Sequence, residues 1–275
     1  MRNLTADLSG RDSVMRVRKA VEAAGGDDPI TRERLAKTLA RHGAFAEAVE
    51  AYLWCLDVGL QKHLSYAAAR RRSVLKAFVA MTDKHPSARK AIEERRNAIE
   101  RTLLTTRDDA NLARNLAELN RCLGDEARNL SLYDRLPRRS RARRILFDRV
   151  LHQLVEHKRY DEVLATLDPM TAFIEETRLA RFSGIPNTDG PEARLRRGTR
   201  AFAVTRGTVL VEALAGNGRV SEARALIDRI LGVDSSAHVR ERLNHHIRRT
   251  HSPELIEYIE SKSVSPDHSR KRPRN

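Results

Sequence analysis

The histidines near the C-terminus are the residues whose type and spacing come nearest to a metal site. His238 and His245 are seven residues apart, so one helix face could carry both, and His246 and His251 follow closely. No carboxylate or cysteine joins them at ligand spacing, and the arginines at positions 240, 242, 248 and 249 would repel a cation. We therefore expect neither a bound metal nor a cofactor.

Catalytic motifs are missing from the chain. It contains no HExxH, GxGxxG, GxxxxGK[ST] or GxSxG. Neighbouring carboxylates such as Glu93 and Glu94 point in different directions on a helix, which indicates a solvated face. Cys55 and Cys122 lie among apolar residues, as small buried side chains in a reducing compartment do. We expect a protein that is not an enzyme.

Positive charge is the most informative chemical property of the sequence. The chain has 52 lysines and arginines against 37 aspartates and glutamates, a net charge of +15. The first sixty residues carry 9 of each sign, whereas residues 61–107 carry 12 basic and 4 acidic side chains. An uneven basic surface is typical of proteins that bind nucleic acid or an acidic partner. Arginine far outnumbers lysine, however, which compositional bias in a GC-rich genome also produces, and both interpretations stay open.

A basic patch for nucleic acid has two candidate loci, the run after Pro137 and the C-terminal tail. Its residues are Arg138, Arg139, Arg141, Arg143, Arg144, Arg270, Lys271 and Arg272. Aromatic residues make up only 4% of the chain and do not alternate with the basic runs, so a base-stacking platform is not expected. The consecutive arginines at positions 70–72 fan around a helix and do not form a stripe.

Helices must position all of these residues. Alanine, leucine, arginine and glutamate fill the long segments, glycine (13) and proline (9) are scarce, and apolar residues recur at intervals of three and four. Asp28-Pro29 and Ser252-Pro253 mark helix starts, because a capping side chain precedes proline at the first helical position. We predict about thirteen helices, no strand and an all-α fold.

Four helical hairpins can be aligned on their turns. They span residues 30–60, 111–137, 145–169 and 205–234, with turns at Gly43, Gly124, Lys158 and Gly218. Two long helices, roughly 65–83 and 87–105, interrupt the first interval, and a loop at 182–199 interrupts a later one. We expect residues 1–28 to form an N-terminal segment with one helix, residues 29–260 a solenoid, and residues 261–275 a disordered basic tail.

The best-matched hairpins resemble tetratricopeptide (TPR) repeats, as found in uncharacterised proteins of bacterial genomes. The first carries Leu35, Ala36, Leu39, Gly43, Ala48, Tyr52 and Cys55, and the fourth carries Leu210, Val211, Leu214, Gly218, Ala223, Ile227 and Ile230. In the others, Lys158 replaces the turn glycine, and Asn120 and Asn129 replace apolar and small residues. The resemblance implies an α-α superhelix, a TPR-like solenoid with irregular inserted helices.

The function that this resemblance implies is a protein-interaction scaffold that binds a peptide or helix of another protein in its groove. The residues that would line the groove are Glu33, Lys37, Arg41, Asp148, His152, Glu156, Thr208 and Glu212. A basic adaptor that binds RNA or DNA non-specifically is the alternative. No stretch approaches about 18 apolar residues and no secretory signal is apparent, so we expect a cytoplasmic protein without a membrane partner.

Overall fold

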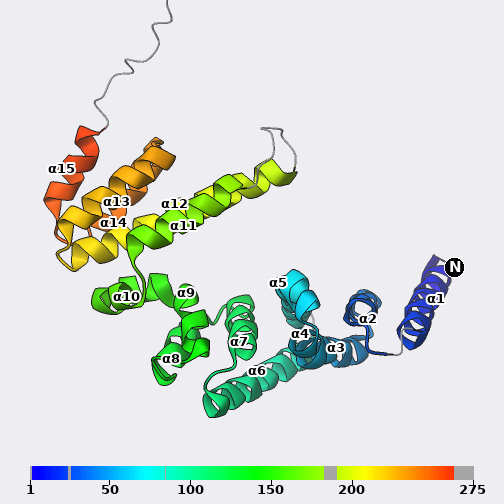
Figure 1. Ribbon diagram of the computed structural model, residues 1–275. Helices are drawn as coiled ribbons and strands as arrows, with labels where there is room; N and C mark the ends of the chain where they lie inside the picture. Colours follow the sequence, from blue (N-terminus) through cyan, green and yellow to red (C-terminus); the bar gives the residue numbers. More distant parts are fainter. Residues whose placement is uncertain (1, 24–25, 84, 183–190, 263–275) are drawn as a thin grey trace, which may run out of the picture. The chain divides into compact units, whose positions relative to one another are not determined.

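The computed structural model describes residues 2–23, 26–83, 85–182 and 191–262 (Figure 1). This part of the chain is mostly helical and contains no strand, which confirms the all-α prediction. It holds fifteen α-helices and one short π-helical segment, two more helices than expected, one of them three residues long. The chain divides into two compact units, Met1–Val150 and Leu151–Asn275.

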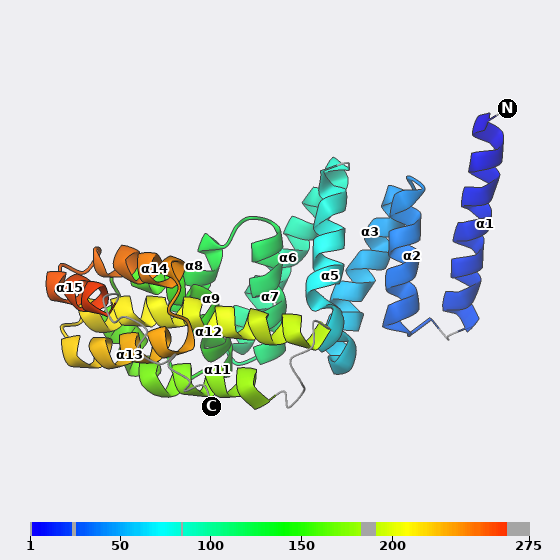
Figure 2. The same cartoon turned by 90° about the horizontal axis from the view of Figure 1, so that it is seen from above.

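The N-terminal unit is a succession of helical pairs. Its elements are α1 (Arg2–Ala23), α2 (Pro29–Arg41), α3 (Phe45–Trp54), η1 (Cys55–Gly59), α4 (Leu60–Lys62), α5 (Leu64–Thr82), α6 (Pro86–Thr106), α7 (Ala110–Cys122), α8 (Ala127–Arg135) and the first part of α9 (Arg141–Glu156). Helices α2, α5 and α7 contact one another in turn and form one layer, and α3 contacts α6 in a second layer (Figure 2).

The helices expected to interrupt the repeats instead continue this stack. Helices α5 and α6 pack on each other, on α2 and α3 on one side, and on α7 on the other. The prediction of an insertion at 65–105 was therefore wrong. The reason is that a hairpin belongs to a stack through its buried faces, and the inward residues Val74, Leu75 and Phe78 of α5 are fully buried although the turn of this pair lacks a glycine.

The four predicted turns share one backbone conformation. Gly43, Gly124 and Gly218 have φ of 76°, 73° and 77°, and Lys158 has φ of 56°. In each turn the next residue donates its N–H to a carbonyl five residues earlier, at 2.8–3.0 Å. These donor–acceptor pairs are Ala44–Leu39, Asp125–Asn120, Arg159–Leu154 and Arg219–Leu214. This bond and the left-handed residue define the Schellman end of a helix, so the alignment on the turns is confirmed at Lys158 as well.

The C-terminal unit is organised around one long helix. It contains α10 (Tyr160–Thr166), α11 (Pro169–Phe182), α12 (Pro191–Gly216), α13 (Val220–Val233), α14 (Ala237–Ile247) and α15 (Pro253–Ser261). Helix α12 contacts α10, α11, α13 and α14, and consequently every residue from 207 to 215 is buried. Gly207 permits a close approach of α11 and α13 to α12, since a β-carbon there would lie 3.0 Å from both Phe173 and Ile230.

Two segments that were predicted to be irregular are partly helical. The loop at 182–199 was predicted too long, because Pro191 opens α12 and residues up to 199 are helical; proline is favoured at a first helical position. Residues 183–190 lie outside the described residues. Of the predicted tail, Ser261 belongs to α15, and residues 263–275 lie outside the described part of the chain.

Candidate anion-binding surface

Three of the predicted groove residues are buried and offer no accessible side chain to a partner. Glu33 is 3% exposed, and Thr208 and Glu212 are 0% exposed. Their expected position on an open groove is therefore corrected. Each has a partner within its own unit: Glu33 pairs with Lys37 and accepts the Tyr66 hydroxyl at 3.1 Å, and the Thr208 hydroxyl donates to the Thr205 carbonyl at 2.8 Å.

Glu212 belongs to a polar network inside the C-terminal unit. His246 Nδ1 lies 2.6 Å from Glu212 Oε2, and Arg249 Nε lies 3.2 Å from Glu212 Oε1. The rings of His152 and His246 are 6.2 Å apart. Partial burial of the His152 imidazole, followed by the charge of His246, lowers the pKa of His152. The contacts of Glu212 with His246 and Arg249 join α12 to α14 and to the turn that follows it. Glu212 is therefore a structural element of the fold.

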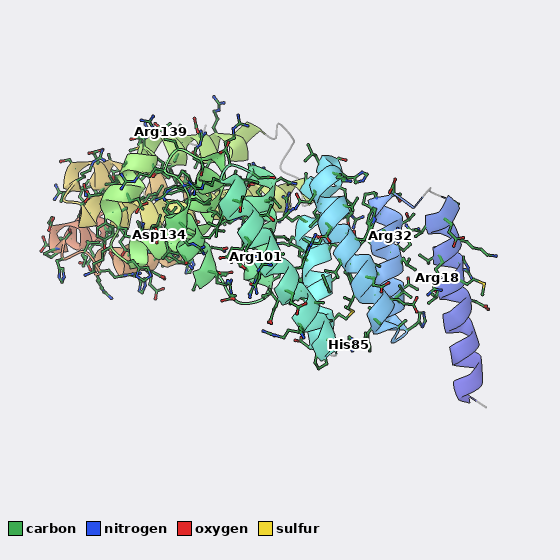
Figure 3. All side chains as sticks on the ribbon, turned by 90° about the horizontal axis from the view of Figure 1, so that it is seen from below. Arg18, Arg32, His85, Arg101, Asp134 and Arg139 are labelled. Carbon is green, nitrogen blue, oxygen red and sulfur yellow. The ribbon has the colours of Figure 1, made fainter. Side chains whose placement is uncertain are left out.

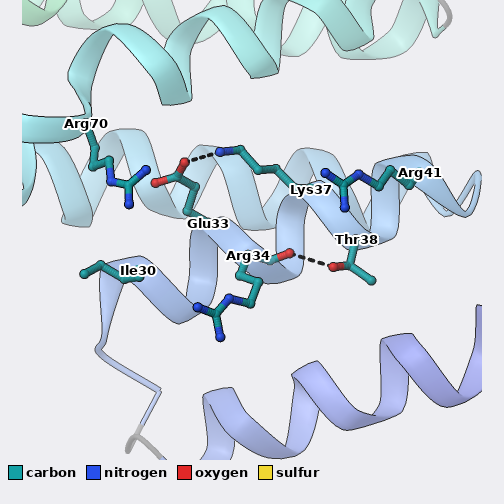
Figure 4. A pocket seen from close by; sticks show the side chains of 7 residues that line it. All are labelled: Ile30, Glu33, Arg34, Lys37, Thr38, Arg41 and Arg70. Carbon is teal, nitrogen blue, oxygen red and sulfur yellow. Dashed lines mark hydrogen bonds and ion pairs between the residues drawn. The ribbon is translucent and has the colours of Figure 1, made fainter. Parts of the chain in front are cut away.

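Lys37 and Arg41 do line a pocket, on helices α2 and α5 (Figure 4). The pocket has a volume of about 170 Å³ and is lined by Ile30, Glu33, Arg34, Lys37, Thr38, Arg41 and Arg70. Lys37 is paired with Glu33. Within the described part of the chain, Arg34, Arg41 and Arg70 have no carboxylate at ion-pair distance. The pocket therefore exposes three guanidinium groups whose charge is not balanced locally.

A second group of cations surrounds the buried carboxylate of Glu118 on α7. Glu118 is 3% exposed, with Arg121 Nη2 at 2.5 Å, Arg72 Nε at 3.3 Å and Arg149 Nη1 at 4.0 Å from its oxygens. Burial acts to raise the pKa of Glu118, but the hydrogen bond from Arg121 and the three positive charges outweigh it, and the pKa is lowered. One carboxylate is thus shared among three arginines.

Arg71 extends this group. Its guanidinium donates to Asn115 Oδ1 at 2.5 Å and to Asn111 Oδ1 at 2.9 Å, both on α7. Desolvation, followed by the like charges of Arg114 and Arg149, lowers the pKa of Arg71. Amide oxygens hold this cation in place without neutralising it, so the positive charge persists beside α7.

The three consecutive arginines of α5 connect the two groups. Helix α5 contacts α2 on one side and α7 on the other, so Arg70 reaches the α2 pocket while Arg71 and Arg72 reach α7. Because these three consecutive side chains point in different directions around α5, they spread positive charge over three helices. We call the combined set the cationic surface; its basic members are Arg34, Lys37, Arg41, Arg70, Arg71, Arg72, Arg114, Arg121 and Arg149, and its two carboxylates are Glu33 and Glu118.

The predicted basic patch at 138–144 is only partly available. Arg143 is 9% exposed, donates to the carbonyls of Tyr133 and Leu136 at 2.8 and 2.9 Å, and stacks 3.9 Å above the Tyr133 ring. Its assignment to an exposed patch is corrected, because it closes the C-terminal end of α8. Arg141 pairs with Asp108. Arg138, Arg139 and Arg144 are exposed, as Figure 3 shows for Arg139. Residues Arg270, Lys271 and Arg272 lie outside the described residues.

The remaining predicted groove residues, Asp148, His152 and Glu156, are exposed on α9.

The sequence analysis did not select Glu118, although its spacing from the turn was a signal. Glu118 precedes its turn residue Gly124 by six positions, as Lys37 precedes Gly43 and Glu212 precedes Gly218. The arginines that surround it come from other helices, and no local pattern indicates that contact.

The described residues define an all-α protein of packed helices, with a concentration of basic side chains on α2, α5, α7 and α9 in its N-terminal unit. Comparison with protein-family models, with curated proteins and with solved structures gave no match. Across the described helices, none has both the length and the apolar character needed to cross a membrane. Among the same residues, no three histidine, cysteine, aspartate or glutamate side chains cluster as a metal site requires.

Proposed function

We propose that this protein is a non-catalytic binding scaffold that holds an acidic segment of a partner protein on its cationic surface. The observation that carries the proposal is the imbalance of charge: nine basic side chains from four helices surround two carboxylates, Glu33 and Glu118, that are already engaged. The unbalanced cations repel one another, so a bound acidic chain lowers the electrostatic free energy of the surface. A TPR-like arrangement, with one helix of each pair lining the binding face, is part of this proposal.

The chemistry of the surface favours carboxylates of a peptide or helix. Arginine binds a carboxylate through two parallel N–H donors, which adds geometric specificity to the charge attraction. The basic side chains lie on successive helices, so acidic residues spaced along an extended or helical segment could each meet one of them.

A nucleic acid is the competing occupant. Against it, none of the residues that we assign to the cationic surface is aromatic, so bases would have no ring on which to stack. Tyr66, which donates to Glu33, is 5% exposed. The exposed Arg138 and Arg139 lie on the connection from α8 to α9, Arg144 lies in the first turn of α9, and none of them is among the residues of this surface.

The test is equilibrium binding of a fluorescent glutamate-rich peptide, with a lysine-rich peptide and a single-stranded RNA as comparisons. Arg72→Glu with Arg149→Glu should weaken binding of the acidic peptide by about tenfold or more, since loss of about 1.4 kcal/mol is a factor of ten. Lys37→Glu with Arg41→Glu should act in the same direction.

The matched control is Lys90→Glu with Arg101→Glu, which changes net charge equally at two exposed positions on α6 (Arg101 is labelled in Figure 3). This control should bind the acidic peptide within about twofold of the unmodified protein, since rim and distant charges contribute little. An equal loss of peptide affinity in the Arg72 and Arg149 double variant and in the Lys90 and Arg101 control would count against the proposal. Stronger binding of the RNA than of the acidic peptide, with a steep dependence on salt, would also count against it.

A further inference from the structure

We propose that the pocket on α2 and α5 is a phosphoryl-binding site that takes a phosphorylated side chain of the bound segment. This inference rests on the proposed function, because it assigns one part of the cationic surface to one chemical group. The pocket is lined by four cations, Arg34, Lys37, Arg41 and Arg70, and by the single carboxylate of Glu33.

Charge is the first reason. Glu33 is engaged twice, by the ammonium of Lys37 and by the Tyr66 hydroxyl, and the three guanidinium groups have no acidic partner among the described residues. The lining therefore has a net charge of +3. A glutamate side chain would leave +2 of this charge unbalanced, whereas a phosphoryl group, which carries nearly two negative charges at pH 7, would leave about +1.

The geometry of the donors is the second reason. The arginines that line the pocket come from two different helices, Arg34 and Arg41 from α2 and Arg70 from α5 (Figure 4). A carboxylate presents two oxygens in one plane, whereas a phosphoryl group presents three acceptor oxygens around a tetrahedral centre. Donors that approach from more than one helix suit the tetrahedral group, and arginine is the residue that binds phosphate through paired N–H donors.

The neutral residues of the pocket suit a side chain better than a nucleotide. Ile30 is 48% exposed and can contact the hydrocarbon stem that bears the phosphate. The Thr38 hydroxyl already donates to the Arg34 carbonyl at 2.9 Å. No aromatic residue lines the pocket, so a base would find no stacking partner there.

The experiment compares three peptides of one glutamate-rich sequence that differ only in a central phosphoserine, glutamate or serine. At pH 7.5 the phosphoserine peptide should bind about tenfold more tightly than the glutamate peptide. This advantage should shrink at pH 5.0, because the second phosphate pKa is about 6 while glutamate, with a pKa near 4.3, stays largely ionised. Both peptides face the same Glu33, Lys37, Arg34, Arg41 and Arg70, so the comparison isolates the titration of the ligand.

Two variants separate this proposal from the proposed function. Arg34→Gln with Arg70→Gln should abolish the advantage of phosphoserine over glutamate but leave most of the binding of the glutamate peptide, which depends also on Arg72 and Arg149. Lys90→Gln with Arg101→Gln, on α6, should retain the full advantage. Arg70→Lys, which keeps the charge and removes the planar pair of donors, provides a milder variant should the double substitution disturb folding.

The outcomes are distinct. Equal affinity for the phosphoserine and glutamate peptides, or an advantage that persists in Arg34→Gln with Arg70→Gln, overturns the phosphoryl site and leaves the scaffold proposal standing. Failure of all three peptides to bind overturns both. Competition by a short RNA that disappears in the same double variant would assign the pocket to a nucleic-acid phosphate and overturn the choice of a phosphorylated side chain.

Discussion

Asn120 donates a hydrogen bond of 2.8 Å to Asn129 where α7 crosses α8, and both residues are buried. The equivalent positions of the first hairpin carry Leu39 and Ala48, which pack without polar atoms. Asn129 also donates to the Ala117 carbonyl at 3.4 Å. A polar pair therefore replaces an apolar contact at this crossing, and the Asn120 side chain depends on Asn129 for its hydrogen bond.

Removing one asparagine should cost more than removing both. Asn129→Ala should lower the free energy of unfolding by about 1–3 kcal/mol, because the Asn120 side chain then stays buried without its acceptor. Asn120→Leu with Asn129→Ala reproduces the apolar pair of the first hairpin and should recover most of that loss. Urea unfolding followed by circular dichroism measures both values. A double variant less stable than the single one would contradict this account of the crossing.

Gly216 is required by a close contact with an aromatic ring. A β-carbon at this position would overlap the ring of Tyr160, which is 8% exposed. Gly216→Ala should destabilise the protein by about 1–3 kcal/mol through overpacking. Gly232→Ala on α13, where a β-carbon meets nothing within 4 Å, is the control and should be neutral or stabilising by up to about 1 kcal/mol. Thermal unfolding distinguishes them, and equal melting temperatures would refute the contact.

Arg143 should be important for stability, whereas its neighbour should not. Arg143→Met removes two hydrogen bonds to main-chain carbonyls and the stacking on Tyr133, and should cost about 2 kcal/mol or more. Arg144→Met removes an equal charge from an exposed position and should change stability by less than about 0.5 kcal/mol. Chemical denaturation of the two variants gives the comparison; similar values would mean that Arg143 acts only through its charge.

The lowered pKa of Asp28 predicts that the stability of the protein depends on pH. Its side chain accepts the Thr31 N–H at 2.8 Å at the start of α2, and this bond lowers the pKa of Asp28 below its ordinary value of 3.8. The stabilisation is therefore complete above pH 3.8 and is lost as the pH falls through the folded-state pKa. Asp28→Ala should cost about 1 kcal/mol at pH 7.

The difference in unfolding free energy between Asp28→Ala and the unmodified protein should be smaller at pH 2.5 than at pH 7, because the Asp28 carboxylate is protonated progressively as the pH falls below 3.8. Unfolding by denaturant at the two pH values measures it. Asp27→Ala, at the exposed neighbouring position, should show no comparable loss at pH 7. A difference for Asp28→Ala that does not change with pH would exclude the carboxylate as its cause.

The two cysteines should differ in reactivity. Burial raises the pKa of the Cys55 thiol to about 12, and Cys55 is 0% exposed. Burial also raises the pKa of Cys122, which is only half-buried. Because the thiolate is the reactive form, iodoacetamide at pH 8 should modify Cys122 first and Cys55 only after unfolding in urea. Peptide mass mapping after timed quenching reads the order, and prompt modification of Cys55 in the folded protein would be the contrary result.

Much of the helical framework could be predicted from local sequence. The turns at Gly43, Gly124, Lys158 and Gly218 were found from the spacing of apolar residues, since helix periodicity and helix ends depend on neighbours within a few positions. The pair α5 and α6 was misjudged because its turn has no glycine, although its buried faces continue the stack.

The sequence by itself determined that this chain is helical, where most of its hairpins turn, and that its middle segments are basic. Only the tertiary structure decided which charges are exposed. Glu33 and Glu212 became buried through Tyr66 and His246, which lie 33 and 34 residues away in the chain. Arg72 met Glu118, 46 residues away, in the same manner. Such contacts depend on how the helices pack, and packing combines faces whose partners no local pattern specifies.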